Sequence, residues 1–349
     1  MIYLNSEILK KIMVKSLTIK KVDKDSIFHL VSSIIQTSLR GVDSHGINLF
    51  PHYFRISDTG RINIHPKMKI NIKNNTVALV DGDHAYGHHA GAVGMEIAIE
   101  LCKKRGVGLV NVSNSSHFGA ASYFGLMAAK NNLIGFATTN ANPLVKAYGS
   151  KETYFGTNPI CFTAPLKNEE PLCLDMATSL TNRNKIKNYE REGKEIPNNW
   201  GYDEEGNPTT NPALVKTLAP IGEYKGFGLS LMVEVFCSIL SGGVISKYIL
   251  EMYDSLYKKR LISHFFSAID PNLFIEIEMF KNNLQKMVEE IRNLPPLDGI
   301  LKVMVPGDPE KDYYKERIVK GIPMDRLKFE EFLSISKDFK EAVIYETDS

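Results

Sequence analysis

The sequence predicts a mixed α and β protein that folds as two lobes. At 349 residues, the chain exceeds the roughly 250–300 residues at which a single hydrophobic core stops growing. Its first 40 residues carry apolar side chains at helical spacing, and the residues after them alternate between strand-like and helix-like segments. We therefore predict a mostly helical lobe from the two chain ends, 1–75 with about 311–349, and a mixed-sheet lobe flanked by helices over about 76–310.

The N-terminal part is expected to form amphipathic helices. Apolar residues such as Ile8, Ile12, Leu30 and Ile34 recur at helical intervals between residues 5 and 39. A further short helix is expected over 50–56, where the chain approaches a Thr-Gly stop. The segment 66–84 then alternates apolar and polar residues, which predicts two paired strands.

The middle of the chain alternates helices and strands. Residues 91–105 place an apolar stripe before Gly106 and predict a helix. Strands are expected at 107–114, 159–165 and 171–179, with a loop, a helix and a strand between 115 and 139. The apolar stretch 227–243 predicts a buried core or subunit-contact helix, since Glu234 argues against a membrane span. Residues 311–341 predict one or two surface helices.

Composition excludes several classes of protein. Lys plus Arg (42) and Asp plus Glu (40) nearly balance, and no long basic run occurs, so no nucleic-acid partner is expected. The N-terminus lacks a signal-peptide core and no long apolar run follows, so we expect a cytoplasmic protein with no membrane partner. The cysteines lack any CxxC spacing and are expected to be buried free thiols: Cys102, Cys161, Cys173 and Cys237.

Two of the nine histidines lie in similar small, polar loops. His45 stands in Ser44-His45-Gly46, and His117 stands in Ser116-His117-Phe118-Gly119. An imidazole can exchange a proton near neutral pH, which suits a reaction that reduces a carbonyl. The alternative is that each ring only hydrogen-bonds its own turn.

Other patterns predict neither a metal site nor a familiar phosphate loop. His84, His88 and His89 are close in sequence, but adjacent histidines cannot share a face and no carboxylate or cysteine completes a known spacing. A metal-dependent lyase would have to use these three, so we expect no metal. The chain contains no G-x-G-x-x-G after a strand and no G-x4-G-K-[ST].

Taken together, seven motifs resemble those of the type 2 malate/L-lactate dehydrogenase family. They occur in one order over about 190 residues, which makes the set far more specific than any single member. The motifs are DSHG (43–46), VDGDHAYG (80–87), NSSHFG (114–119), GTNPICFTAP (156–165), LDMATS (174–179), GYDEEGNPTTNP (201–212) and EYKGFGLSLMVE (223–234).

The resemblance implies an oxidoreductase that uses NAD or NADP. Its small-molecule substrate would be a 2-hydroxy or 2-oxo acid such as malate or lactate, or, as in some members, a cyclic imine or ureidoglycolate. It also implies a non-Rossmann nucleotide-binding domain, in keeping with the missing glycine fingerprint, and a homodimer whose site lies between domains. A reductase of a sugar-derived keto acid and a catalytically inactive, regulatory nucleotide-binding relative remain alternatives.

Matching this chain to the family's motifs gives the expected site. His117 would be the general acid/base, with His45 orienting the substrate or sharing the proton transfer. The expected substrate-binding residues are Ser44, Tyr53, Arg40 and His52. The expected cofactor-binding residues are Asn140, Asn158, Asp175, Met176, Ala177, Thr178, Ser179, Lys225, Gly226, Pro306, Gly307 and Asp308.

Two positions depart from the family's pattern. Leu49 stands four residues after the DSHG histidine, where many relatives carry an arginine that can grip a carboxylate. Either a neighbour such as Arg40, His52 or Arg55 replaces that arginine, or the substrate lacks the carboxylate geometry of malate and lactate. Asn184 stands where relatives often have glycine, and its side chain disfavours the close backbone contact with a cofactor that glycine permits.

Overall fold

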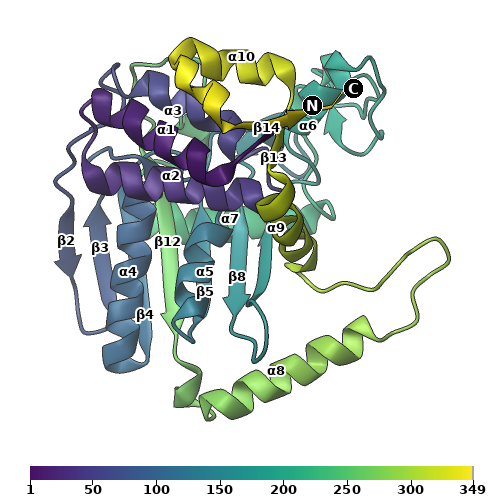
Figure 1. Cartoon of the computed structure of the whole chain (residues 1–349). Coiled ribbons are helices and arrows are strands. Elements are labelled where there is room, and N and C mark those ends of the chain that lie inside the picture. The colour runs from purple at the N-terminus through teal and green to yellow at the C-terminus, as the bar shows by residue number, and fades with distance from the viewer. Residues whose placement is uncertain (348–349) are drawn as a thin grey trace.

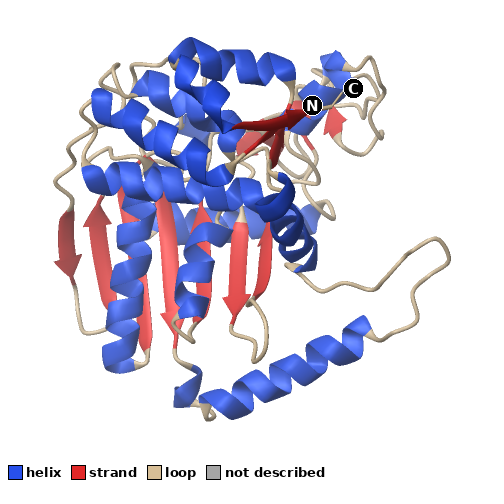
Figure 2. Ribbon diagram, in the orientation of Figure 1, coloured by secondary structure: helices blue, strands red, loops and turns tan. Residues whose placement is uncertain are grey.

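A seven-stranded mixed sheet forms the centre of the computed structural model, which describes residues 1–347. Only β3 and β4 pair in parallel, and the other neighbouring strands are antiparallel. The strands are, in spatial order, β2 (Lys69–Ile72), β3 (Val77–Asp81), β4 (Val107–Ser115), β12 (Ile262–Ile269), β5 (Ile134–Thr139), β8 (Ile160–Ala164) and β9 (Leu172–Met176) (Figures 1 and 2).

Helices cover both faces of this sheet. Successive residues of a strand point to opposite faces, and Phe265 and Phe266 of β12 show the consequence. Phe266 packs in the core beneath α4 (Gly87–Arg105) and α5 (Ser122–Lys130), whereas Phe265 packs with Val233 and Cys237 on the other side. Those two residues belong to α7 (Tyr224–Glu234) and its π-helical continuation Val235–Ile239. Helix α4 begins four residues before the predicted start at 91.

A helical layer built from both chain ends lies across one end of the sheet (Figure 1). It contains α1 (Ser6–Ile19), α2 (Lys24–Leu39), α3 (Phe50–Ile56), α9 (Asp308–Lys320) and α10 (Arg326–Ile335). Asn5 and Asp23 cap the first two helices through their side chains. Phe50, Phe332 and Phe339 meet in one apolar cluster, which joins the two ends of the chain. The predicted helices are confirmed, and the division into two domains stays a prediction.

Two smaller sheets complete the fold. β1 (Ile2–Leu4) lies between β13 (Ile322–Met324) and β14 (Val343–Glu346). The second sheet has the order β10 (Gly201–Tyr202), β11 (Thr217–Leu218), β6 (Val145–Lys146) and β7 (Thr153–Phe155). Helix α6 (Arg183–Arg191) packs against this second sheet through Ile186, beside Val145 and Leu218.

The stretch around α7 is helical, as predicted, but it is not buried all round, because Val235, Ile239 and Leu240 are 41%, 59% and 56% exposed. This excludes a core helix, and the alternative of a subunit-contact helix stays a prediction. The other face of the stretch is buried and holds Val233 and Glu234. Apolar length alone could not distinguish a helix buried all round from one that leaves an apolar face open.

Another helix, α8 (Ile277–Arg292), was not predicted from the sequence. It runs along the far end of the sheet and is followed by a long excursion to α9 (Figure 1). Its Val288 packs with Leu166 and Val305, and its last residue, Arg292, forms ion pairs with Glu169 and Asp308. Within residues 1–347, no helix is both long and apolar enough to cross a membrane. The four cysteines are buried free thiols, as predicted.

Candidate active site

The loop that carries His45 is held by helices α2 and α9. It follows α2, and a Cβ on Gly46 would come 2.4 Å from Ser38 Oγ of that helix, so only glycine fits. The same Ser38 hydroxyl accepts the Ile47 N–H at 2.7 Å. Arg317 of α9 donates to both carboxylate oxygens of Asp43, at 2.5 and 2.9 Å. The C-terminal part of the chain therefore braces the histidine loop.

The loop that carries His117 is locked against the start of α4. Ser116 Oγ accepts the Gly87 N–H at 2.8 Å and donates to the Ala85 carbonyl at 3.0 Å. A Cβ on Gly87 would lie 2.3 Å from the Ser116 carbonyl oxygen, so glycine permits this close approach. His117 is thereby placed between the end of β4 and the start of α5.

The two imidazoles lie side by side. Their ring centroids are 5.6 Å apart and the planes differ by 23°. Tyr53 Oη lies 2.7 Å from His117 Nδ1, and Ser44 Oγ lies 2.9 Å from His45 Nδ1. A hydroxyl can donate or accept, so each partner orients its ring in either protonation state. Both histidines line one cavity of about 340 Å³.

Burial sets the protonation of both rings. It lowers the pKa of His117 well below its ordinary value, and the neighbouring His45 and Arg260 lower it further. Burial also lowers the pKa of His45, against the opposing effect of Asp175. Both imidazoles are therefore neutral near pH 7. A neutral imidazole can accept a proton from a hydroxyl group.

The rest of the cavity wall is rich in cations. Arg260 is buried in it, Lys187 and Lys216 lie exposed at its edge, and Glu251 is the acidic side chain among the lining residues. Leu49 also lines the cavity. Sequence reasoning missed Arg260, because it follows two lysines in Lys258-Lys259-Arg260 and such a run is usually a solvated surface.

A second recess of about 200 Å³ adjoins the first, and His45 lines both. Small side chains form one part of its wall: Gly119, Ala120, Ala121, Ser122 and Ala177. Asp175 also lines it and accepts the Ser122 N–H at 2.7 Å. Desolvation by the surrounding protein raises the pKa of Asp175, and its hydrogen bond with Ser122 opposes this shift. Small walls with a few polar groups suit a flat, polar ring, so the residues fit a nicotinamide.

Comparison with known proteins identifies the family. A profile of the malate/L-lactate dehydrogenase family matches residues 4–332. This chain belongs to that family. A malate dehydrogenase from Pyrococcus horikoshii is 37% identical to this dehydrogenase over 335 residues, 93% of this chain and 92% of that protein.

Other relatives act on different acids. Ureidoglycolate dehydrogenase (NAD(+)) from Escherichia coli O157:H7 is 32% identical over 289 residues, 83% of each chain. The solved structure of the sulfolactate dehydrogenase from Methanocaldococcus jannaschii is 31% identical, with a TM-score of 0.91 over 99% of this chain and 100% of that one. Family membership confirms the predicted NAD(P)-dependent dehydrogenase and the mixed α/β fold with helix-flanked sheets.

Three residues expected near the cofactor form buried hydrogen bonds within the protein. Asn140 Nδ2 donates to Glu234 Oε1 at 3.2 Å, and Asn158 Nδ2 donates to Glu234 Oε2 at 3.3 Å. Both amides are buried. Thr178 is also buried and hydrogen-bonds Ser230 Oγ at 2.7 Å. Their sequence neighbours Thr157 and Ala177 line the recess.

The other expected cofactor residues are spread around the recess. Met176 is half-buried at the end of β9, and Ser179 is buried, donating to the Thr181 carbonyl at 2.7 Å. Lys225 is exposed at the start of α7, next to the buried Gly226. Pro306 and Gly307 precede α9, where Asp308 is held by Arg292. None of these lines the recess itself, whereas Glu310 of α9 does and was not predicted.

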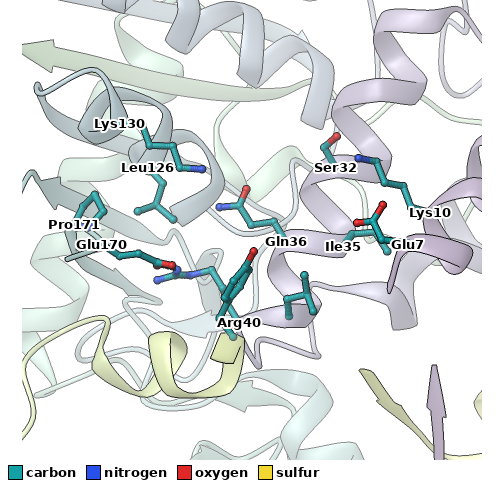
Figure 3. A pocket seen from close by; sticks show the side chains of 12 residues that line it. Glu7, Lys10, Ser32, Ile35, Gln36, Arg40, Leu126, Lys130, Glu170 and Pro171 are labelled. Atoms are coloured by element: carbon teal, nitrogen blue, oxygen red, sulfur yellow. Dashed lines mark hydrogen bonds and ion pairs between the residues drawn. The ribbon is translucent and has the colours of Figure 1, made fainter. Parts of the chain in front are cut away.

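The expected substrate residues divide into two groups. Ser44 lines the histidine cavity, and Tyr53 hydrogen-bonds His117 through its hydroxyl. His52 and Arg55 instead line a neighbouring groove between α3, α6 and α10. Arg40 borders the recess but its guanidinium Nη1 donates to Glu170 at 2.6 Å, in a separate surface groove (Figure 3). Arg40 therefore does not share the cavity that contains both histidines.

The remaining histidines do not gather around one point. His88 is buried in α4 against Tyr53, His89 hydrogen-bonds Ser26 Oγ at 2.9 Å, and His84 lies in a turn with positive φ. Among residues 1–347, no group of three or more His, Cys, Asp or Glu side chains is arranged to hold a metal ion.

Proposed function

We propose that this dehydrogenase interconverts a small 2-hydroxy acid and the corresponding 2-oxo acid, with His117 as the general acid/base. The observation that carries the proposal is the pairing of His45 and His117 in a cation-lined cavity that opens onto a recess with small walls. Malate, ureidoglycolate and sulfolactate, the substrates after which the relatives are named, are all 2-hydroxy acids.

The roles follow from the surroundings of each group. The bound nicotinamide supplies or accepts the hydride. Neutral His117 accepts the hydroxyl proton when the acid is oxidised, and the protonated ring returns a proton to the carbonyl oxygen in the reverse direction. Tyr53 holds the His117 ring through Nδ1, which leaves Nε2 for the substrate. His45, fixed by Ser44, orients the substrate beside the recess.

Residues of the recess would hold the cofactor. Ala120, Ala121 and Ala177 leave room for the ring, and Asp175 can accept a hydrogen bond from its amide or ribose. One further observation supports occupancy by a polar group. Arg40 Nη2 is buried beside the recess and has no hydrogen-bond partner among the described residues. Such a nitrogen is costly unless something accepts its hydrogen bond.

The test is a panel of reactions followed by the absorbance of reduced nicotinamide. Purified protein would be mixed with NADH or NADPH and, in turn, with oxaloacetate, pyruvate, 3-sulfopyruvate and a cyclic imine carboxylate. We expect turnover with at least one 2-oxo acid, and the ratio of rates with the two cofactors gives the cofactor preference. Cofactor binding without turnover on any compound would contradict the proposal and favour the inactive, regulatory relative.

We also propose that the chain forms a homodimer, as the resemblance implies. The exposed apolar side chains of Leu231, Val235, Ile239 and Leu240 support this, because apolar patches on a protein surface commonly mark an interface. Light scattering after gel filtration should give twice the mass of 39.2 kDa. Val235→Asp should shift the mass toward the monomer, and a monomeric parent protein at micromolar concentration would contradict the dimer.

A further inference from the structure

Arg260 is a buried cation in the histidine cavity. It lies between a turn-rich segment and β12, and Leu261 with φ of +57° turns the chain between them. Only 4% of Arg260 is exposed, and the residue lines the cavity together with His45 and His117. Its positive charge also lowers the pKa of His117, which lines the same cavity.

Among the described residues, no carboxylate forms an ion pair with this guanidinium, although Glu251 lines the same cavity and its charge favours the protonated form. Its Nε donates to the Leu250 carbonyl at 2.9 Å and its Nη2 donates to Asn142 Oδ1 at 2.6 Å, both uncharged acceptors. Across residues 1–347, no Asp or Glu oxygen lies within 4.0 Å of it, and Nη1 makes no hydrogen bond. Burial lowers the pKa of Arg260 to about 9, and nearby Arg61 contributes. A buried charge without a counterion is strongly unfavourable, so the site favours an anion.

The other candidates for an anion partner are occupied or elsewhere. Leu49 is apolar. Arg40 is paired with Glu170 outside this cavity. Arg183 lines the cavity but is only half-buried, and its Nη1 donates to the Val215 carbonyl at 2.5 Å. Lys187 and Lys216 are exposed at the edge, where water screens their charge. Arg260 is thus a buried cation of this cavity, and its Nη1 makes no hydrogen bond with the described residues.

We propose that Arg260 binds the carboxylate of the 2-hydroxy or 2-oxo acid and so presents the adjacent carbon to His117. The inference rests on the proposed function, because it requires a substrate with a carboxylate next to the reacting carbon. Asn142 and the Leu250 carbonyl hold two of the guanidinium nitrogens, which leaves Nη1 for the substrate. Arg260 performs the task that the apolar side chain at position 49 cannot perform.

The experiment pairs a change in the enzyme with a change in the substrate. The best 2-oxo acid of the panel, for example pyruvate, is compared with its methyl ester, which lacks the negative charge. For the parent protein, kcat/KM should be ~10- to 150-fold higher for the acid than for the ester, the range of a charge-assisted hydrogen bond. For Arg260→Gln this ratio should fall to within about threefold of unity, mainly through a higher KM for the acid.

Controls separate binding from folding. Arg105→Gln removes an exposed arginine at the end of α4 that does not line the cavity. That variant should keep the parent's acid-to-ester ratio. Arg260→Lys keeps the charge and should retain part of the ratio, which covers the case that Arg260→Gln is unstable. NADH affinity, measured by fluorescence titration, should change less than about threefold in all three variants.

The outcomes are distinct. An unchanged acid-to-ester ratio in folded Arg260→Gln would overturn the role of Arg260 and leave the dehydrogenase proposal standing. Failure of the parent protein to reduce any 2-oxo acid with either cofactor would overturn the proposed function itself.

Discussion

Two buried charged side chains, Glu234 and Arg260, differ in how the protein satisfies them. Glu234 accepts five hydrogen bonds from four residues, whose donors are Asn140 Nδ2, Asn158 Nδ2, Ser238 Oγ and both N–H and Oγ of Ser246. Arg260 has two neutral acceptors and a nitrogen without a partner. The carboxylate is saturated by the protein, whereas the guanidinium is completed only by a ligand. The first arrangement stabilises the fold, and the second stores binding energy for an anion.

The largest effect on stability should come from the saturated charge. Glu234→Ala leaves the Ser246 N–H and hydroxyl without good acceptors in a buried place, so we expect a loss of about 3 kcal/mol in the free energy of unfolding. Urea denaturation followed by circular dichroism measures this. Arg260→Met should instead change stability by less than about 1 kcal/mol or raise it, because it removes a buried charge without a counterion. Equal losses of unfolding free energy in the two variants would contradict the difference drawn between Glu234 and Arg260.

Removing the hydroxyl of Tyr53 should have an intermediate effect, which is on turnover and not on stability. Tyr53→Phe deletes the hydrogen bond to His117 Nδ1, so we expect kcat to fall about tenfold, as for the loss of one buried hydrogen bond. Tyr86→Phe is the matched control. Tyr86 is equally buried and donates to the Tyr53 carbonyl at 3.0 Å, but it does not contact His117. Similar kcat values in the two variants would mean that Tyr53 does not position the imidazole.

The smallest expected effect concerns pH. Because burial lowers the pKa of His117 well below its ordinary value, the ring is already neutral above that lowered pKa and can accept a proton. In the oxidation direction, kcat/KM should therefore be nearly constant from pH 8 to pH 6 and decrease only at lower pH. A decline with a midpoint between pH 6.5 and 7.5 would show that the catalytic base is not desolvated in this way.

The sequence was most informative where the signal is local. Helical spacing predicted α1 to α3, and alternation predicted the pair β2 and β3, because both depend on nearby residues. The paired histidine loops could also be predicted, since glycine and serine mark turns with special geometry. Helix α8 carries an apolar stripe at Leu284, Val288 and Ile291 that would have identified it, although its place is set by ion pairs to Glu169, over 100 residues away.

Residues whose role depends on distant partners were the hardest to assign. Asn140 and Asn158 stand in motifs that predict cofactor contacts, but their amides are bound to Glu234, 94 and 76 residues further along the chain. Arg260 follows two lysines and gives no local sign of burial. Its surroundings arise from Asn142 and from the segment that Arg61 holds at Met252 and Ser255, which no pattern within a few residues reveals.

The most direct test of the account is a single-turnover measurement on His117→Ala. The variant would be saturated with NADH or NADPH and mixed with the preferred 2-oxo acid, and the loss of reduced-nicotinamide absorbance would be compared with that of the parent. We expect the rate to fall ~10²- to 10⁴-fold while cofactor affinity stays within about threefold of the parent value. Equal rates in the variant and the parent would contradict the assignment of His117 as the group that moves the proton.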